Sequence, residues 1–140
     1  MPNNNHLTDV AIVATCVAEE DRPNFLPHHF IKYFLLLENK LYDLADRFGK
    51  EYRGGCWDFY DLSNGGGYLG LEPTRLLTVS MPNGYSAIVN GNTFGIIVSL
   101  YAINWLSHDT LSEHLADKYH LLHDFACQQP ESALILSAID

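Results

Sequence analysis

One stretch of the sequence, residues 54–68, constrains the fold of this chain more than any other. It reads GGCWDFYDLSNGGGY, with its aromatic residues between two groups of glycines. Over residues 56–61 successive side chains can point to opposite sides, which is the period of a β-strand. Residues 63–67 are typical of a tight turn, because Asn and Gly tolerate positive φ angles. The stretch therefore predicts a β-hairpin whose second strand is residues 68–71.

The alternation does not fix which aromatic side chains of this hairpin are buried. Trp57 and Phe59 can point into the core while Tyr60 faces solvent, or the reverse. Exposed Trp and Tyr side chains supply much of the binding energy of protein interfaces. The orientation therefore decides whether the motif can contact a partner or packs the sheet.

Length and charge limit the classes of protein that this chain can represent. With 140 residues we expect one domain spanning residues 1–140, with a flexible polar segment over residues 1–8. The formal net charge of −9 argues against specific nucleic-acid binding, which depends on Lys and Arg contacts to phosphates. Mimicry of DNA would need dense carboxylates along one face, whereas the 17 acidic residues are scattered apart from Glu19, Glu20 and Asp21.

Cysteine usage and hydropathy predict a cytoplasmic protein. The three cysteines have no C-x-x-C spacing, which fits a reducing compartment. We see no signal peptide and no apolar run long enough to span a membrane.

The remaining pattern predicts an α+β domain in which an antiparallel β-meander packs against several helices. Residues 10–17 are apolar and β-branched and indicate a buried strand. Residues 25–30 contain a central Pro27, which favours a bend that holds aromatic side chains in place. Further strands are expected at residues 76–80 and 86–89, and helices at 30–49, 94–106, 110–128 and 131–138. The helix over 94–106 is apolar on all sides, as expected of a buried central helix.

No group of residues carries a specific catalytic or metal-binding motif, so we expect neither enzymatic activity nor a cofactor or metal. Ser63 lies in a strand–turn–strand context, whereas a hydrolase nucleophile elbow needs a helix after the serine. His114, His120 and His123 can share part of a helix face, but their spacing specifies a metal site only weakly. A small hydrolase or metal-dependent enzyme that uses Ser63 or this histidine face is the alternative to a binding protein.

Three segments together resemble the ArdB/KlcA antirestriction family. The central run is similar to the family's W-x-F-Y-x-L-S-N-G-G hairpin, with glycines before it. Arg22 followed by residues 25–30 resembles an R-x-x-F-[LW]-P-x-H-F segment. The third segment is the C-terminal part, which includes Tyr119, residues 124–126, Pro130, Glu131 and the final Ile139 and Asp140.

The resemblance implies a small protein of plasmids, prophages or genomic islands that protects incoming DNA. It would block DNA cleavage by type I restriction–modification complexes, directly or indirectly, without catalysis and without copying DNA charge. The partner-binding residues that it implies are Arg22, Trp57, Tyr60, Ser63, Asn64, Gly65, Gly66 and Tyr68, with Asp140 as a second contact. It leaves the targeted subunit and the oligomeric state open.

Overall fold

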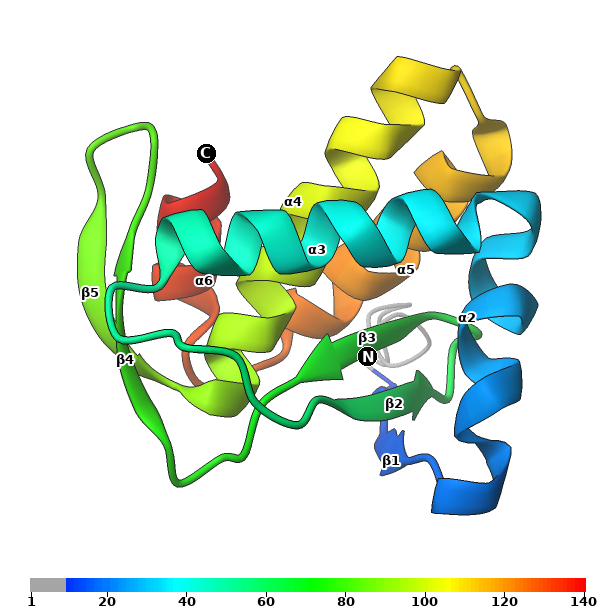
Figure 1. Ribbon diagram of the computed structural model, residues 1–140, viewed down its shortest axis with the longest axis horizontal. Coiled ribbons are helices and arrows are strands. Elements are labelled where there is room, and N and C mark those ends of the chain that lie inside the picture. Colours follow the sequence, from blue (N-terminus) through cyan, green and yellow to red (C-terminus); the bar gives the residue numbers. More distant parts are fainter. Residues whose placement is uncertain (1–9) are drawn as a thin grey trace, which may run out of the picture.

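Helix α4, Gly91–Thr110, runs through the centre of the molecule, and the other elements pack around it (Figure 1). The structure is a computed structural model that describes residues 10–140, so the predicted flexible segment lies outside the described residues. Asn90 caps the helix, because its side-chain oxygen accepts a hydrogen bond from the Thr93 amide. As the sequence predicts, α4 is apolar on all sides and buried along most of its length.

The strands form two separate antiparallel sheets. In one, β1 (Ala14–Cys16), β2 (Asp58–Leu62) and β3 (Gly67–Gly70) lie side by side in chain order. In the other, β4 (Leu76–Ser80) pairs with β5 (Ser86–Asn90), and a single bridge joins Val79 of β4 to Gly49. The α+β class is confirmed, and both predicted hairpins are present.

The two hairpins are not joined in a single sheet, because the chain turns away after β3. The Leu71 amide bonds to the Gly91 carbonyl, and a turn closed from Arg75 to Glu72 redirects the backbone. The side of β4 that could have met β3 instead accepts a bond from the Lys50 amide. Residues 71–75 therefore place the second hairpin beside the N-terminal end of α4, whereas α5 runs alongside that helix (Figure 1).

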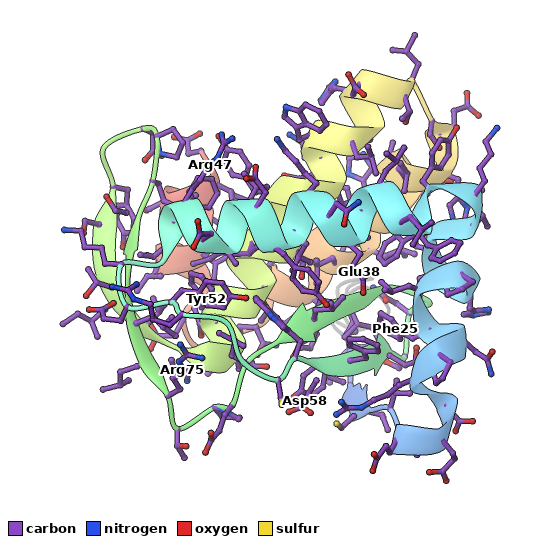
Figure 2. The ribbon with its side chains drawn as sticks, viewed as in Figure 1. Phe25, Glu38, Arg47, Tyr52, Asp58 and Arg75 are labelled. Carbon is purple, nitrogen blue, oxygen red and sulfur yellow. The ribbon has the colours of Figure 1, made fainter. Side chains whose placement is uncertain are left out.

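The segment predicted as a bend around Pro27 is a helix, so that prediction was wrong. Helix α2, Arg22–Phe30, has Pro23 in its first turn and Pro27 in its interior. The second proline removes one backbone bond, which the burial of Phe25, Leu26, His29 and Phe30 offsets. Phe25 points from α2 toward the β2–β3 hairpin, and its ring lies 5.0 Å from that of Phe59 (Figure 2).

The other helices follow the predicted pattern closely. Two short 3-10 turns, Glu19–Asp21 and Ile31–Tyr33, flank α2. Helix α3 spans Phe34–Phe48, α5 spans Glu113–Cys127 with Ser112 as its N-cap, and α6 spans Ser132–Ile139. Within residues 10–140 no helix is long and apolar enough to cross a membrane.

Strand β1 is not the buried strand that its composition predicts. It has three residues at the edge of the sheet, and the flanking Val10 and Val13 are 65% and 57% exposed. An edge strand is covered on fewer sides than a central one, so β-branched residues at this position indicate extended backbone without burial.

Candidate functional site: the β2–β3 hairpin and its turn

The structure resolves the orientation of the aromatic residues on the hairpin. Trp57 is only 6% exposed, and its indole N–H donates to the Tyr52 hydroxyl at 3.2 Å. Tyr60 is partly exposed and stacks on Tyr68 with a ring separation of 4.8 Å. Phe59 is half-buried beneath α2. Trp57 is therefore inward, whereas Phe59 and Tyr60 lie on opposite faces of β2 and are each partly exposed. The observed arrangement matches the first orientation for Trp57 and, in part, for Tyr60, but not for Phe59.

Tyr68 also belongs to the core. It is 1% exposed, its hydroxyl donates to Asn92 Oδ1 at 2.7 Å, and its ring stacks against Phe125. Burial raises the pKa of this hydroxyl well above its ordinary value. Trp57 and Tyr68 thus support the hairpin from beneath, and neither offers a surface to a partner.

The turn after β2 is fastened on both sides by its own polar residues. Ser63 exchanges two bonds with Val13: its amide donates to the Val13 carbonyl, and its hydroxyl accepts from the Val13 amide at 2.8 Å. Asn64 accepts from the Gly66 amide and donates to the Leu121 carbonyl of α5. Gly65 has φ of +96°, a backbone conformation in which a residue with a side chain would be strained. The turn therefore has a fixed shape.

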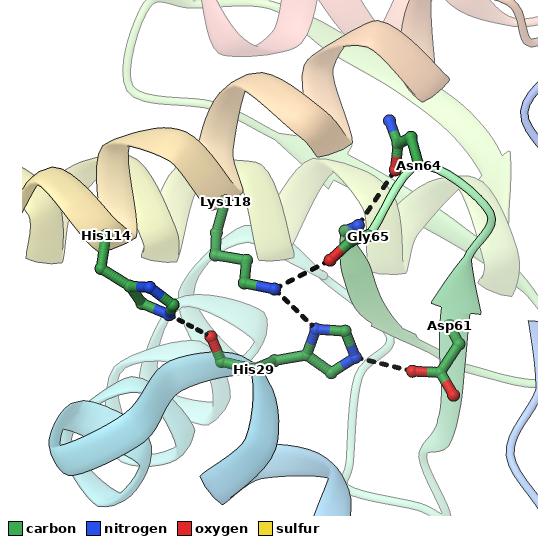
Figure 3. A network of polar contacts seen from close by, with 7 residues as sticks. His29, Asp61, Asn64, Gly65, His114 and Lys118 are labelled. Atoms are coloured by element: carbon green, nitrogen blue, oxygen red, sulfur yellow. Dashed lines mark hydrogen bonds and ion pairs between the residues drawn. The ribbon is translucent and has the colours of Figure 1, made fainter.

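A buried histidine of α2 connects this turn to two helices (Figure 3). His29 Nε2 lies 2.6 Å from Asp61 Oδ1 on β2, and its Nδ1 lies 3.2 Å from the Lys118 ammonium. Lys118 also donates to the Gly65 carbonyl at 2.8 Å, and His114 donates to the His29 carbonyl. One cluster thus ties α2, β2, the turn and α5 together.

The contacts assign the protonation state of this histidine. An ammonium can only donate, so Nδ1 of His29 accepts from Lys118, and Nε2 carries the proton that it donates to Asp61. The ring is therefore neutral. In agreement, burial lowers the pKa of His29; the hydrogen bond to Asp61 opposes this shift, and the Lys118 charge adds to it. Burial likewise lowers the pKa of Lys118.

Two predicted contact residues lie away from the turn. Arg22, at the start of α2, forms an ion pair with Asp58 at the beginning of β2, and its guanidinium lies over the Phe59 ring. Asp140 lies at the other end of the molecule, where its main-chain carbonyl accepts from the Asn83 side chain in the β4–β5 turn. Arg22 and Tyr60 therefore lie along the β2–β3 hairpin, whereas Asp140 lies at a separate place beside the β4–β5 turn.

The predicted site residues fall into three groups. Arg22, Tyr60, Ser63, Asn64 and Gly65 are wholly or partly exposed along the hairpin, and we call these five residues the hairpin surface. Trp57, Tyr68 and Gly66 are buried. Asp140 is exposed at the second location.

The structure does not bring the three histidines of α5 into one site. His114 bonds to α2, His123 lies 3.6 Å from Cys127 Sγ, and the ring of His120 meets that of Tyr119 edge-on. In the part of the chain that the structure describes, no group of three His, Cys, Asp or Glu residues is placed to hold a metal ion. The Ser63 hydroxyl is engaged with β1, as described above.

Sequence reasoning missed His29, Asp61 and Lys118. Reading residues 25–30 as a bend hid the relevant signal. In a helix, Phe25 and His29 are four residues apart and share a face, so His29 would be expected in the core. Its partners come from segments 32 and 89 residues further along the chain, which local pattern does not reveal.

Comparison with known proteins identifies the family. The family model for antirestriction proteins matches residues 50–140. Antirestriction protein KlcA of Escherichia coli is 37% identical over 146 aligned residues, covering 96% of this chain and all of that protein. Putative antirestriction protein YubI of Escherichia coli strain K12 is also 37% identical, over 75% of this chain and 77% of its own length.

A solved structure agrees in fold over most of the chain. It belongs to work on the KlcA and ArdB proteins that reports a novel fold and antirestriction activity against type I DNA restriction systems in vivo but not in vitro. The two chains superimpose with a TM-score of 0.85 at 32% identity, over 92% of this chain and 95% of the other. The chain therefore belongs to the ArdB/KlcA family of antirestriction proteins.

Proposed function

We propose that this chain inhibits DNA cleavage by type I restriction–modification complexes and so protects incoming mobile DNA. The observation that carries the proposal is the agreement with KlcA and ArdB in sequence and fold across nearly the entire chain. Antirestriction activity against type I DNA restriction systems in vivo is described for KlcA and ArdB, and the same fold here presents the hairpin that carries the family's motif.

The proposed mechanism is protein–protein contact without catalysis. The hairpin surface is suited to this because its turn is held by Ser63 on one side and by Asn64 and Lys118 on the other. A surface that is already ordered loses little conformational entropy on binding. Scattered acidic residues also favour contact through shape over imitation of a DNA backbone.

Within this proposal the residues have different roles. The hairpin surface makes the contact, whereas Trp57, Gly66 and Tyr68 hold its shape from the core. Asp140 provides a second contact at the other end of the molecule, beside the β4–β5 turn.

The test is plating of unmodified phage on a restricting Escherichia coli host that expresses the protein. A cellular assay is required because the relatives' activity is described in vivo but not in vitro. Ser63→Glu places a charge on the exposed turn, while its carboxylate can still accept from the Val13 amide. We expect the Ser63→Glu variant to lose its ability to protect the phage. Ser86→Glu makes the same change at an exposed position of β5 and should keep that ability. Full protection by a folded Ser63→Glu variant would exclude the hairpin surface as the site of contact with the restriction complex.

Two further measurements separate the parts of the mechanism. A photo-crosslinking amino acid in place of Ser63 should capture a subunit of the restriction complex in cells, and its failure to do so would contradict direct contact. Methylation by the same complex should continue while cleavage is blocked. Loss of both activities would instead indicate competition for DNA.

A further inference from the structure

The outer edge of strand β1 has main-chain groups that point away from the sheet. Val13 and Val17 bond to the main chain on the β2 side, at Ser63 and Phe59. In an antiparallel ladder such bonded residues alternate with residues whose N–H and C=O point outward. By this alternation Ala14 and Cys16 direct their N–H and C=O groups away from β2. Within residues 10–140 no strand pairs with that edge.

A cavity of about 340 Å³ adjoins this edge on the side covered by α2. Residues 15–18 form one wall, and Asn24, Phe25 and His28 of α2 form the other. Successive side chains of an added strand would point alternately toward and away from this cavity. The cavity therefore has room for side chains of an extended segment that pairs with β1.

The charge around this edge is strongly negative. Glu19, Glu20 and Asp21 begin two residues beyond the end of β1 and are exposed, and the half-exposed Asp61 borders the same cavity. The nearby cations are engaged elsewhere: Arg22 with Asp58, and Lys118 with the Gly65 carbonyl and His29. His28 also lines the cavity.

We propose that β1 receives an extended segment of a partner protein that carries Lys or Arg at alternating positions. The outward groups of Ala14 and Cys16 bond its main chain, while the carboxylates of Asp21 and Asp61 receive its basic side chains. This surface is distinct from the hairpin surface and does not depend on the identity of the restriction target. The β5 edge lacks the flanking acidic run, so it does not fit the same segment.

The first test is residue-specific amide hydrogen exchange of the full-length free protein by NMR. We expect the Ala14 and Cys16 amides to exchange quickly, and the Thr15 and Val17 amides, which face β2, to exchange slowly. Slow exchange at Ala14 and Cys16 would mean that residues 1–9 or a second copy already cover the edge, and would overturn the proposal.

The second test adds a synthetic probe, the peptide acetyl-Thr-Lys-Val-Arg-Thr-Lys-amide. It should slow exchange at Ala14 and Cys16, whereas the peptide with Glu in place of each basic residue should not. The assignment of the site to β1 would be contradicted if the two peptides slowed exchange equally. It would also be contradicted if saturating basic peptide slowed exchange only at other amides, or at none.

Variants make the test independent of the choice of peptide. Cys16→Pro removes an outward N–H without touching the bonds to β2, and proline is tolerated at such edge positions. It should weaken binding of the basic peptide about tenfold, the change expected for one net hydrogen bond. Ser86→Pro, on the edge strand β5, is the matched control and should leave binding unchanged.

A charge pair completes the design. Asp21→Lys should weaken binding of the basic peptide and strengthen binding of the acidic one. The helix itself should stay intact, because the Asp21 side chain makes no capping hydrogen bond to α2. Asp46→Lys makes the same change of net charge at an exposed position of α3 and should have little effect on binding of either peptide. Similar effects of both substitutions would assign the preference to net charge and refute a site at β1.

Discussion

Replacement of Lys118 by Met tests the cluster that fastens the hairpin turn. Methionine keeps most of the length of the side chain and removes only the ammonium group. That group donates to the Gly65 carbonyl at 2.8 Å and lies 3.2 Å from His29 Nδ1. Gly65 is exposed, so water can replace the bond to its carbonyl, whereas Nδ1 belongs to a side chain that is 3% exposed.

The expected loss of stability follows from this difference in exposure. A buried acceptor left without a partner costs roughly 1–3 kcal/mol, and an exchangeable surface bond adds little. We therefore expect Lys118→Met to lower the free energy of unfolding by about 2 kcal/mol. The control is Lys50→Met, which makes the same change of charge at an exposed lysine. Its free energy of unfolding should lie within about 0.5 kcal/mol of that of the parent protein.

The same substitution should raise the pKa of His29, because the Lys118 charge contributes to lowering it. In the parent protein this pKa lies below the ordinary value of 6.5. Between these two values the unfolded chain binds a proton that the folded chain does not, so stability decreases as pH falls through that interval. With the pKa raised toward 6.5 the interval narrows, and Lys118→Met should lose less stability on acidification than the parent does.

Urea unfolding at several pH values, together with NMR titration of the His29 ring, measures both effects. Unchanged stability together with an unchanged or lower His29 pKa would refute the bonding scheme at Nδ1. Lower stability with no change in the pKa would mean that Lys118 acts only on the turn.

Two further substitutions test the packing beneath the hairpin. In an isolated helix Gly95→Ala would stabilise the helical conformation by about 1 kcal/mol. Its Cβ would, however, overlap the Leu69 carbonyl oxygen, so chemical denaturation should show a net loss of about 2 kcal/mol. Exposed Asn104→Ala in the same helix should be neutral or stabilising. Tyr68→Phe removes the bond to Asn92 and should lower the melting temperature through a loss of about 1 kcal/mol; an unchanged midpoint would contradict that bond.

Much of the fold could be predicted because its elements have strong local patterns. The α3 and α4 helices, the β2–β3 hairpin and the Asn-Gly turn before β5 each depend on spacing within a single segment. The helix across Pro27 was missed because burial of four neighbouring side chains outweighs one lost backbone bond, and burial is not a local property. The division into two sheets likewise depends on contacts of residues 71–75 with distant segments.

The candidate site was predictable in position and only partly in role. The motif located the hairpin, but alternation alone could not decide that Trp57 and Tyr68 lie in the core while Tyr60 reaches solvent. That result depends on which face meets Phe94 and Phe125, two residues of later helices. His29 and Lys118 carry no motif, so only the tertiary structure joins them to the turn.

The central position of α4 has a consequence for how the molecule unfolds. The two sheets share no backbone ladder, yet β3 of one and both strands of the other pack on this helix. A two-stranded hairpin such as β4–β5 is marginal in water by itself. The β4–β5 hairpin therefore cannot persist once α4 separates from it, so its unfolding is coupled, through a helix that belongs to neither sheet, to the region that holds β3.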